Sequence, residues 1–426
     1  MTTATSLGQP SATYLIDSYR FSWPDVEVLC DRLHEERDGL KCELSVSTSR
    51  KPMAGLLRSG RFNLSSATTR SQWQRALEER MPEMDWYAAF EMVCALTTRR
   101  WRDGEPVLDL AEVEPYSGVP FLLPPFIVEG AASVLFAEGG TGKSLLALAM
   151  CVTIATGDVV IPGVEATRYG PTLYLDWEWD AAVHAERLKA ICAGAGIEVP
   201  HGMVHYRHEM ASIYEAAPTI RRRIAELGVA FVVIDSLGFA RGGEPESADL
   251  TLKTFAALRT FGVPVLCLDH VAKNATDKKH SFGSVYTTNA ARITWRADAV
   301  KEEGSNKIVV GLTNQKSNGR FQKARGYEIT MDIDENDKLT SVVFEATDLR
   351  DIPGLTKALP MRDQIAGILR AAKKALEVEA ITQALINEGS RWSSDSIRVC
   401  LNRNKGMFER EEEGGWTMRN YTLQGA

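Results

Sequence analysis

The sequence has no run of about 20 apolar residues, the length that a helix needs to cross a bilayer. It has no Cys-x-x-Cys pair either. Its seven cysteines are widely spaced, which argues against zinc ribbons and thiol redox motifs and fits a reducing compartment. Residues 1–12 lack the basic and apolar parts of a signal peptide, so we expect a disordered lead-in there. These absences predict a cytoplasmic protein with no membrane partner.

An excess of basic residues is also lacking. Lysine and arginine number 49 against 56 aspartates and glutamates, which gives a net charge of −7. Such a chain is not expected to bind nucleic acid over its whole surface, so any nucleic-acid site must be a local basic loop or channel. The remaining composition is typical of a globular protein, and 426 residues predict two or three domains.

Changes in composition and in apolar spacing divide the chain into segments. They are the lead-in 1–12, an N-terminal domain 13–118, an α/β domain 119–348, a linker 349–360 and a C-terminal module 361–426. The N-terminal domain is expected to be a small α+β domain, and its role does not follow from its sequence.

The N-terminal domain carries mixed signals. A proline at position 24, with acidic residues close by, predicts a helix over Trp23–Glu36. Alternating side chains predict a strand over Glu43–Ser47, and apolar residues at helical spacing predict helices over Ser71–Arg80 and Met84–Thr98.

Short apolar strands alternate with helices in the α/β domain. The expected strands are Ser133–Phe136, Thr172–Leu175, Phe231–Ile234 and Val265–Leu268, and the expected helices are Ser144–Ala155, Ala182–Ala193, Pro218–Leu227 and Leu250–Phe261. This alternation predicts a mostly parallel sheet covered by helices. Two later runs, Lys307–Leu312 and Gly326–Thr330, are expected to add strands to it.

The C-terminal module is expected to contain three helices and a hairpin. The helices are Arg362–Lys374, Val378–Asn387 and one that runs to Asn402 after a cap at Ser393 or Ser394, and the hairpin pairs Phe408–Arg410 with Trp416–Leu423. This order predicts a winged helix-turn-helix.

The charges of this module favour two partners equally. Arg391, Arg398, Arg403 and Lys405 lie on or near the expected recognition helix and suit DNA. Glu409 and the run Glu411-Glu412-Glu413 load the wing with negative charge, which repels DNA and favours a protein partner.

A phosphate-binding motif follows the first strand of the α/β domain. The spacing Ala137-x-x-x-x-Gly142-Lys143-Ser144 is that of a P-loop, with alanine at the first position. Glycines let backbone N–H groups approach phosphate oxygens, the lysine neutralises phosphate charge, and the hydroxyl can ligate magnesium. We therefore expect ATP and Mg²⁺ as cofactors. The expected nucleotide contacts are Glu138, Gly139, Gly140, Thr141, Gly142, Lys143, Ser144 and Leu145.

Carboxylates follow two other strands. Asp235 ends one strand, where it could hold magnesium together with Ser144. The acidic segment Asp176–Asp180 follows another, and within it Glu178 is our candidate for the general base that activates water. The alternatives are a strand-capping aspartate and a solvated acidic turn. His270, after a further strand, either senses the γ-phosphate or is structural.

In this order the motifs resemble the RecA-like superfamily over about residues 119–345. Within it they resemble the hexameric RepA/DnaB-type replicative helicases and phage- or plasmid-associated AAA-family ATPases. The matching segments are Leu173–Glu178, Val233–Leu237, Leu268–Lys273, Phe282-Gly283-Ser284 with Ala290-Ala291-Arg292, and Thr313–Arg320. They are similar to the strand with the catalytic glutamate, the Walker B strand, the histidine-bearing sensor strand, the small-residue helix after the DNA-facing loop, and the finger motif.

The resemblance implies a ring, expected to be a hexamer, in which the finger motif reaches the ATP of a neighbouring subunit. Lys316 keeps the lysine of that motif, but Asn318 stands where arginine is expected. Arg320 is a possible substitute. The N-terminal domain is not similar to a helicase accessory domain.

The resemblance also implies a loop that lines the channel of the ring and contacts single-stranded DNA. The candidate nucleic-acid residues are Lys273, Lys278, Lys279 and His280, together with Arg241 in a second glycine-rich segment. We therefore expect a helicase or replication motor. The alternatives are a filament-forming recombination or repair ATPase, a regulatory or defence ATPase that binds protein, and a small-molecule kinase, for which no acceptor site is evident.

Overall fold

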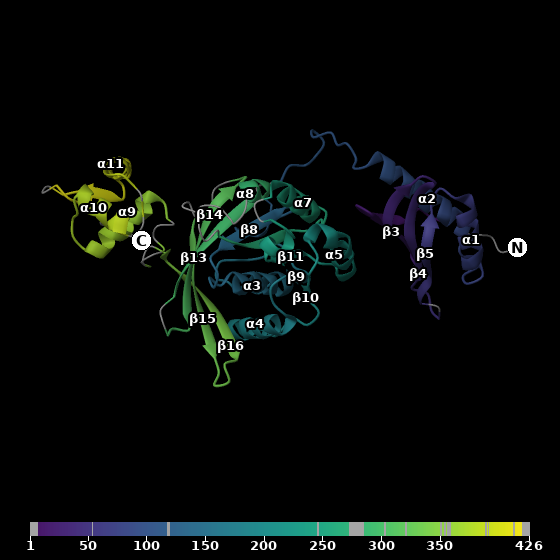
Figure 1. Cartoon of the computed structure of the whole chain (residues 1–426), viewed down its shortest axis with the longest axis horizontal. Helices are drawn as coiled ribbons and strands as arrows, with labels where there is room; N and C mark the ends of the chain where they lie inside the picture. Colours follow the sequence, from purple (N-terminus) through teal and green to yellow (C-terminus); the bar gives the residue numbers. More distant parts are fainter. Residues whose placement is uncertain are drawn as a thin grey trace, which may run out of the picture. The chain divides into compact units, whose positions relative to one another are not determined.

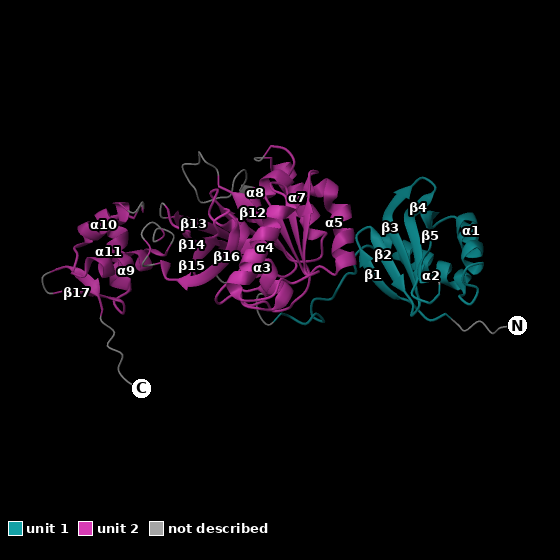
Figure 2. Ribbon diagram, turned by 90° about the horizontal axis from the view of Figure 1, so that it is seen from below, with its two compact units in different colours: residues 1–116 teal, residues 117–426 magenta. Residues whose placement is uncertain are grey.

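The computed structural model divides the chain into two compact units, residues 1–116 and 117–426 (Figure 2). It describes residues 7–52, 54–116, 120–244, 247–271, 285–301, 304–319, 322–349, 352, 355, 359–387, 390, 392–411 and 414–419. Each unit is built around its own sheet. No helix in these ranges is both long and apolar enough to cross a membrane.

The first unit is an antiparallel sheet with two helices. Its strands pair in chain order, and they are β1 (Ser11–Leu15), β2 (Ser18–Ser22), β3 (Val26–Glu36), β4 (Gly39–Thr48) and β5 (Gly55–Asn63), followed by α1 (Ala67–Glu78) and α2 (Trp86–Asp103). Phe62 of β5 packs edge-on against Trp73 of α1 and stacks on Phe90 of α2. These aromatic contacts join the sheet to both helices, as expected for a sheet with one apolar face.

The helix expected over Trp23–Glu36 is wrong, because most of this segment is strand β3. Val26, Val28 and Cys30 are buried at alternate positions and face the core. This alternation, with β-branched residues, is typical of a strand with one buried face. Pairing with β2 and β4 therefore outweighs the local preference for a helix that the proline and the acidic residues indicated. The other three expected elements are confirmed, within β4, α1 and α2.

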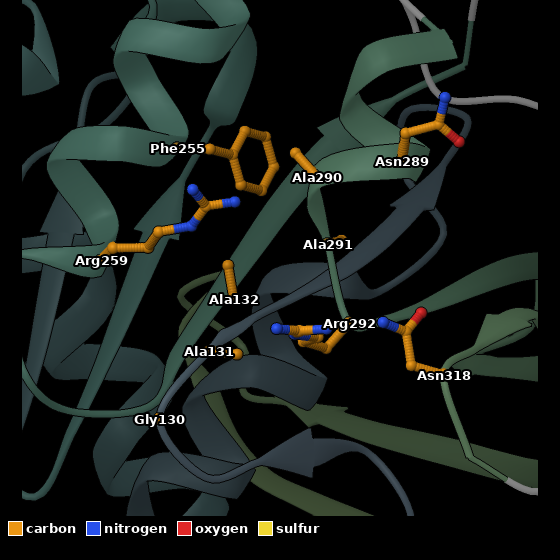
Figure 3. A pocket seen from close by; sticks show the side chains of 10 residues that line it. All are labelled: Gly130, Ala131, Ala132, Phe255, Arg259, Asn289, Ala290, Ala291, Arg292 and Asn318. Atoms are coloured by element: carbon orange, nitrogen blue, oxygen red, sulfur yellow. The ribbon is translucent and has the colours of Figure 1, made fainter. Parts of the chain in front are cut away.

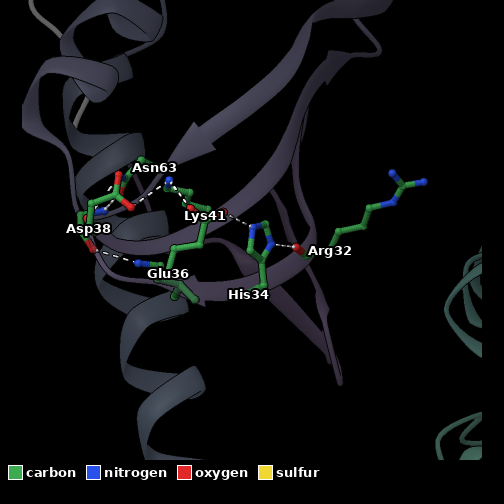
Figure 4. Close-up of polar contacts among 8 residues, drawn as sticks. Arg32, His34, Glu36, Asp38, Lys41 and Asn63 are labelled. Atoms are coloured by element: carbon green, nitrogen blue, oxygen red, sulfur yellow. Dashed lines mark hydrogen bonds and ion pairs between the residues drawn. The ribbon is translucent and has the colours of Figure 1, made fainter.

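The β3–β4 hairpin is tied down by polar side chains at its turn (Figure 4). Lys41 Nζ lies 2.8 Å from Glu36 Oε2 and 2.9 Å from Asp38 Oδ1. Because these pairs are exposed to solvent, they add little to the stability of the fold. Gly39 has a φ of +122°, and a Cβ there would lie 2.3 Å from Ser65 Oγ, so the turn requires glycine.

The second unit contains a nine-stranded sheet (Figure 1), with the order β10-β9-β11-β12-β8-β13-β14-β15-β16. The parallel strands are β8 (Ala132–Ala137), β9 (Thr172–Asp176), β10 (Val204–His208), β11 (Phe231–Asp235), β12 (Val265–His270) and β13 (Ile293–Lys301). The antiparallel strands are β14 (Lys307–Ser317), β15 (Arg325–Ile333) and β16 (Leu339–Thr347). A small ladder of β6 (Phe121–Leu123) and β7 (Ile127–Val128) precedes them.

Helices cover both faces of this sheet. The helices are α3 (Lys143–Thr156), α4 (Ala181–Ala195), α5 (Ile213–Leu227), α6 (Leu237–Ala240), α7 (Ala248–Arg259) and α8 (Val285–Ala290). Val233 of β11 packs in one core with α3 and α4, and its neighbours Val232 and Ile234 pack in the other with α5 and α7. Strands buried on both faces are continuously apolar, which is why the sequence revealed them as short hydrophobic runs.

The expected strands and helices of this domain are confirmed, with one shift. Pro218 lies inside α5, which begins five residues earlier after a capping box at Ser212. Three strands of the nine-stranded sheet were not expected, and neither was the small ladder of β6 and β7. The first, β10, is a partly exposed edge strand with polar residues, and β13 and β16 also alternate polar with apolar side chains. Strand β16 packs on α4 so closely that a Cβ on Gly194 would lie 2.0 Å from the carbonyl oxygen of Val342.

The C-terminal module has a separate apolar core. It contains α9 (Met361–Ala372), α10 (Val378–Asn387), α11 (Ser394–Arg403) and the hairpin of β17 (Phe408–Arg410) with β18 (Trp416–Met418). The expected cap is confirmed, since Ser393 Oγ accepts a hydrogen bond from Ser396 N–H. The element order is that of the expected module, and its identity as a winged helix-turn-helix stays a prediction.

Candidate nucleotide-binding site

The P-loop joins the end of β8 to the start of α3. Gly140 and Gly142 have φ angles of +72° and +82°, a conformation that glycine adopts without strain. Lys143 is only 7% exposed, and its Nζ donates hydrogen bonds of 3.1 Å and 3.0 Å to the carbonyl oxygens of Ala137 and Glu138. Burial lowers the pKa of Lys143, because the charged form has lost hydration. A phosphate group would supply the negative charge that this buried cation lacks.

Ser144 and Asp235 meet beside the P-loop. The Ser144 hydroxyl donates a hydrogen bond of 2.8 Å to Asp235 Oδ2, and the Tyr174 hydroxyl donates one of 2.6 Å to the same oxygen. Burial raises the pKa of Asp235, and these two hydrogen bonds oppose that effect. The aspartate is thus held in a fixed orientation in a site that favours an added positive charge.

These residues suit magnesium. A hydroxyl and a carboxylate are hard oxygen ligands, and Mg²⁺ is commonly held by one or two such groups together with nucleotide phosphates. Within the described ranges no cluster of three His, Cys, Asp or Glu side chains could hold a metal alone. Ser144 and Asp235 would therefore hold Mg²⁺ jointly with ATP. When bound, the ion would supply charge neutralisation at the phosphates.

Glu178 and His270 approach each other at the same edge of the sheet. His270 Nε2 lies 3.4 Å from Glu178 Oε1, and both side chains are partly exposed. The hydrogen bond from His270 lowers the pKa of Glu178, against the opposing effect of burial. Glu178 also interacts electrostatically with Lys143 and Asp235. The glutamate is therefore ionised and open to solvent, which are the two properties that a base acting on water needs.

Asp176 occupies a different environment from Glu178. Its side chain is fully buried, and it accepts hydrogen bonds from the backbone N–H groups of Glu178 and Trp179. His184 Nε2 and the Tyr206 hydroxyl lie 2.9 Å and 3.1 Å from Asp176 Oδ2. Burial alone would raise the pKa of Asp176, but these hydrogen bonds outweigh it and lower the pKa. Asp176 therefore orients the turn that carries Glu178.

Sequence reasoning missed this supporting network. Nothing in the local pattern connects Asp176 with His184 on α4 or Tyr206 on β10, because β10 was not expected. The link from Tyr174 to Asp235 was also missed. It follows from the register, in which Tyr174 of β9 lies beside Val233 of β11, two residues before Asp235.

The P-loop thus lies at the carboxyl edge of a mostly parallel sheet. Carboxylates from β9 and β11 and the histidine of β12 surround it. A protein family described as an AAA domain matches residues 106–276, which include the P-loop, Glu178, Asp235 and His270. Over these residues the chain is similar to that AAA family, and its central domain is a P-loop α/β domain with a mostly parallel sheet.

Among solved structures, the chain is similar to a KaiC-like protein from the hyperthermophilic archaeon Pyrococcus horikoshii. The identity is 16%, the match covers 55% of this chain and 99% of that chain, and the TM-score is 0.37. A likeness of that degree assigns no function. No curated protein matches the sequence.

The expected finger residue of the ATPase domain lies far from this site. Lys316 is at the end of β14, where Ser317 pairs with Ile293 at the start of β13, so it lies at the amino edge of the parallel strands. Its Nζ donates hydrogen bonds of 2.7–2.8 Å to the carbonyl oxygens of Thr288, Asn289 and Ala291. Lys316 therefore caps the end of α8 in the single chain, and it cannot reach the P-loop of its own subunit.

The expected nucleic-acid residues have separate outcomes. Lys273, Lys278, Lys279 and His280 lie outside the described residues, as does Arg320. Arg241 was expected to contact nucleic acid from a glycine-rich segment, but its side chain is fully buried. Its guanidinium lies 3.2 Å from Asp269 Oδ2 and donates a hydrogen bond of 2.7 Å to the Thr287 hydroxyl. Because a buried, paired arginine does not face a ligand, the expectation that Arg241 contacts nucleic acid is wrong.

Proposed function

We propose that the protein is an ATPase that works as a ring of identical subunits and couples the hydrolysis of Mg-ATP to action on single-stranded DNA. One observation carries the proposal. Lys143, Glu178 and Asp235 lie at the carboxyl edge of the sheet, whereas Lys316 of the finger motif lies at the amino edge. A second copy can bring the two sets together.

In this proposal each residue of the site has a defined task. Lys143 and the P-loop amides bind and orient the phosphates, and Ser144 and Asp235 hold the metal. Glu178 accepts the proton of the attacking water, and His270 keeps this glutamate ionised. Such positioning and charge neutralisation supply most of the rate enhancement in phosphoryl transfer.

The DNA part of the proposal rests on the basic residues Lys273, Lys278 and Lys279. ATP turnover with and without single-stranded DNA tests it. The expected result is a faster rate with DNA, and electron micrographs with ATP would then distinguish a ring from a recombination filament. A rate that DNA leaves unchanged would contradict the proposal.

A second candidate function is a regulatory or defence ATPase whose partner is a protein. The net charge of −7 and the burial of Arg241 favour it, because both reduce the positive surface available to DNA. In that case ATP turnover would be insensitive to DNA, and the C-terminal module would be the expected site of protein contact.

A further inference from the structure

A cavity of about 230 Å³ opens at the amino edge of the parallel strands (Figure 3). Its walls come from the start of β8, the last turn of α7, the end of α8 and the residue after β14. Arg259 of α7 and Arg292 before β13 extend into it from opposite sides. Phe255 and Ala132 add apolar surface to the walls.

The lining of this cavity is positive. Among the described residues that line it, the cavity includes the amides of Asn289 and Asn318 beside the two arginines, and no acidic residue. In the part of the chain that the structure describes, neither Arg259 nor Arg292 forms an ion pair. Both side chains are exposed, so their donors are available to a ligand.

The donor set indicates the class of ligand. One guanidinium suffices for a carboxylate, which carries a single charge and two oxygens. Two guanidinium groups with two amides match a phosphate, which carries up to two charges and at least three acceptor oxygens. The apolar walls exclude water from one side and strengthen the attraction.

The phosphate cannot come from the nucleotide of the same subunit. The cavity lies at Ala132 and the P-loop follows Ala137, so the length of β8 separates them by about 17 Å at about 3.3 Å per residue. The cavity is instead next to the finger motif. Asn318 stands where the finger motif is expected to carry an arginine. Its N–H donates a hydrogen bond of 3.1 Å to the carbonyl oxygen of Arg292, so Arg292 lies beside the position that lacks the expected charge.

We propose that this cavity is a phosphate-binding site, formed by Arg259 and Arg292 with Asn289 and Asn318. The phosphate belongs either to ATP held by a second copy of the chain or to a free phosphate compound. ATP of a second copy, the first source, rests on the proposed function. A free phosphate compound, the second source, does not.

The free source is tested with pyrophosphate and a chain whose own P-loop is disabled by Lys143→Ala. Isothermal titration should show binding that weakens at least tenfold when Arg259→Ala and Arg292→Ala are added. Lys253→Ala is the matched control, because it removes one cation from the same helix, where Lys253 pairs with Asp249. Arg292→Lys should retain part of the affinity, since it keeps the charge and loses the planar fork.

ATP held by a second copy, the first source, is tested by mixing two inactive chains. One carries Arg259→Ala with Arg292→Ala and keeps its P-loop, and the other carries Lys143→Ala and keeps its cavity. If the cavity acts on the ATP of a neighbour, an equal mixture should regain about one quarter of wild-type turnover, because half of the intact P-loops then meet an intact cavity.

The two arms separate the outcomes. Loss of pyrophosphate affinity without recovered turnover assigns the cavity to a free phosphate, and recovered turnover assigns it to the ATP of a neighbour. Unchanged affinity together with no recovery would overturn the inference, provided that circular dichroism shows every variant folded. Failure of the proposed function is distinguishable, since it would appear as a wild-type ATP turnover that single-stranded DNA leaves unchanged, whatever the pyrophosphate titration shows.

Discussion

The hydroxyl of Ser144 donates a 2.8 Å hydrogen bond to the carboxylate of Asp235, although 91 positions separate the two residues. One follows the P-loop lysine and the other ends strand β11. Their contact joins the P-loop to the carboxylate that we expect to hold magnesium. The hydrogen bond fixes the orientation of both side chains, which would limit the reorganisation that catalysis requires.

Lys143→Ala should reduce ATP turnover by about a hundredfold or more, because it removes the charge that balances the phosphates. Turnover is measured by phosphate release. Lys189→Ala is the matched control, since Lys189 is an exposed lysine on α4. Turnover close to the wild-type rate in the Lys143→Ala chain would refute the assignment of the P-loop.

Glu178→Gln should keep ATP binding and stop hydrolysis, because glutamine retains the shape of the side chain and cannot accept the proton. A fluorescent ATP analogue measures binding, and phosphate release measures hydrolysis. The comparison variant is Asp176→Asn. If Asp176→Asn stops hydrolysis at unchanged stability while Glu178→Gln does not, the general base is Asp176.

Asp176→Asn should mainly lower stability, by roughly 1–3 kcal/mol, since it disturbs a buried acceptor of several hydrogen bonds. The pKa of Asp176 is lowered in the folded state, so its contribution is complete above its ordinary value of 3.8 and is lost as the pH falls through the folded pKa. Urea unfolding at two pH values measures this. The variant should lose its excess acid sensitivity, and an unaltered pH dependence would contradict the hydrogen-bond network.

His270→Ala should move the acid limb of the kcat–pH profile to higher pH. The hydrogen bond from His270 lowers the pKa of Glu178 below its ordinary value of 4.5, and without it burial acts in the opposite direction. The carboxylate would then take up a proton at a higher pH. Steady-state rates at saturating ATP measure the profile, with circular dichroism as the check on folding. An acid limb that stays in place would show that His270 does not tune Glu178.

Charge removal at Lys278 and Lys279 should weaken binding to single-stranded DNA and flatten its salt dependence. Each lost phosphate contact lowers the slope of log K against log salt by about 0.7 for a single strand. Fluorescence anisotropy over a range of salt measures both, with Lys189→Ala as the control. Equal slopes in the two variants would indicate that these lysines do not contact DNA.

The ATPase domain could be predicted from the sequence because its signals are local. The P-loop has a fixed spacing, and strands buried on both faces are continuous apolar runs, as in Phe231–Ile234. Strands that are half-exposed lack that signal. The strand Val204–His208 was missed for this reason. The strand Val26–Glu36 was assigned to a helix because a proline precedes it, and a proline occurs in a turn before a strand as well as in the first turn of a helix.

The candidate site was predictable only in part. Lys143, Ser144, Glu178, Asp235 and His270 each lie at the end of a strand or shortly after it, so a parallel sheet gathers them at one edge. The burial of Arg241 depends instead on its contacts with Asp269 and Thr287, which are 28 and 46 positions away in the sequence. No local pattern records such partners. The cavity of Arg259 and Arg292 was missed for the same reason.

The P-loop and the Arg259–Arg292 cavity lie at opposite edges of one sheet. If the cavity acts on the ATP of a neighbour, copies joined through these two edges can only associate head to tail. In an open row of subunits, the ATP of one terminal subunit has no neighbouring Arg259–Arg292 cavity. The cavity of the other terminal subunit has no neighbouring ATP. Specific activity would then rise with assembly size, and only closure into a circle would leave every site complete.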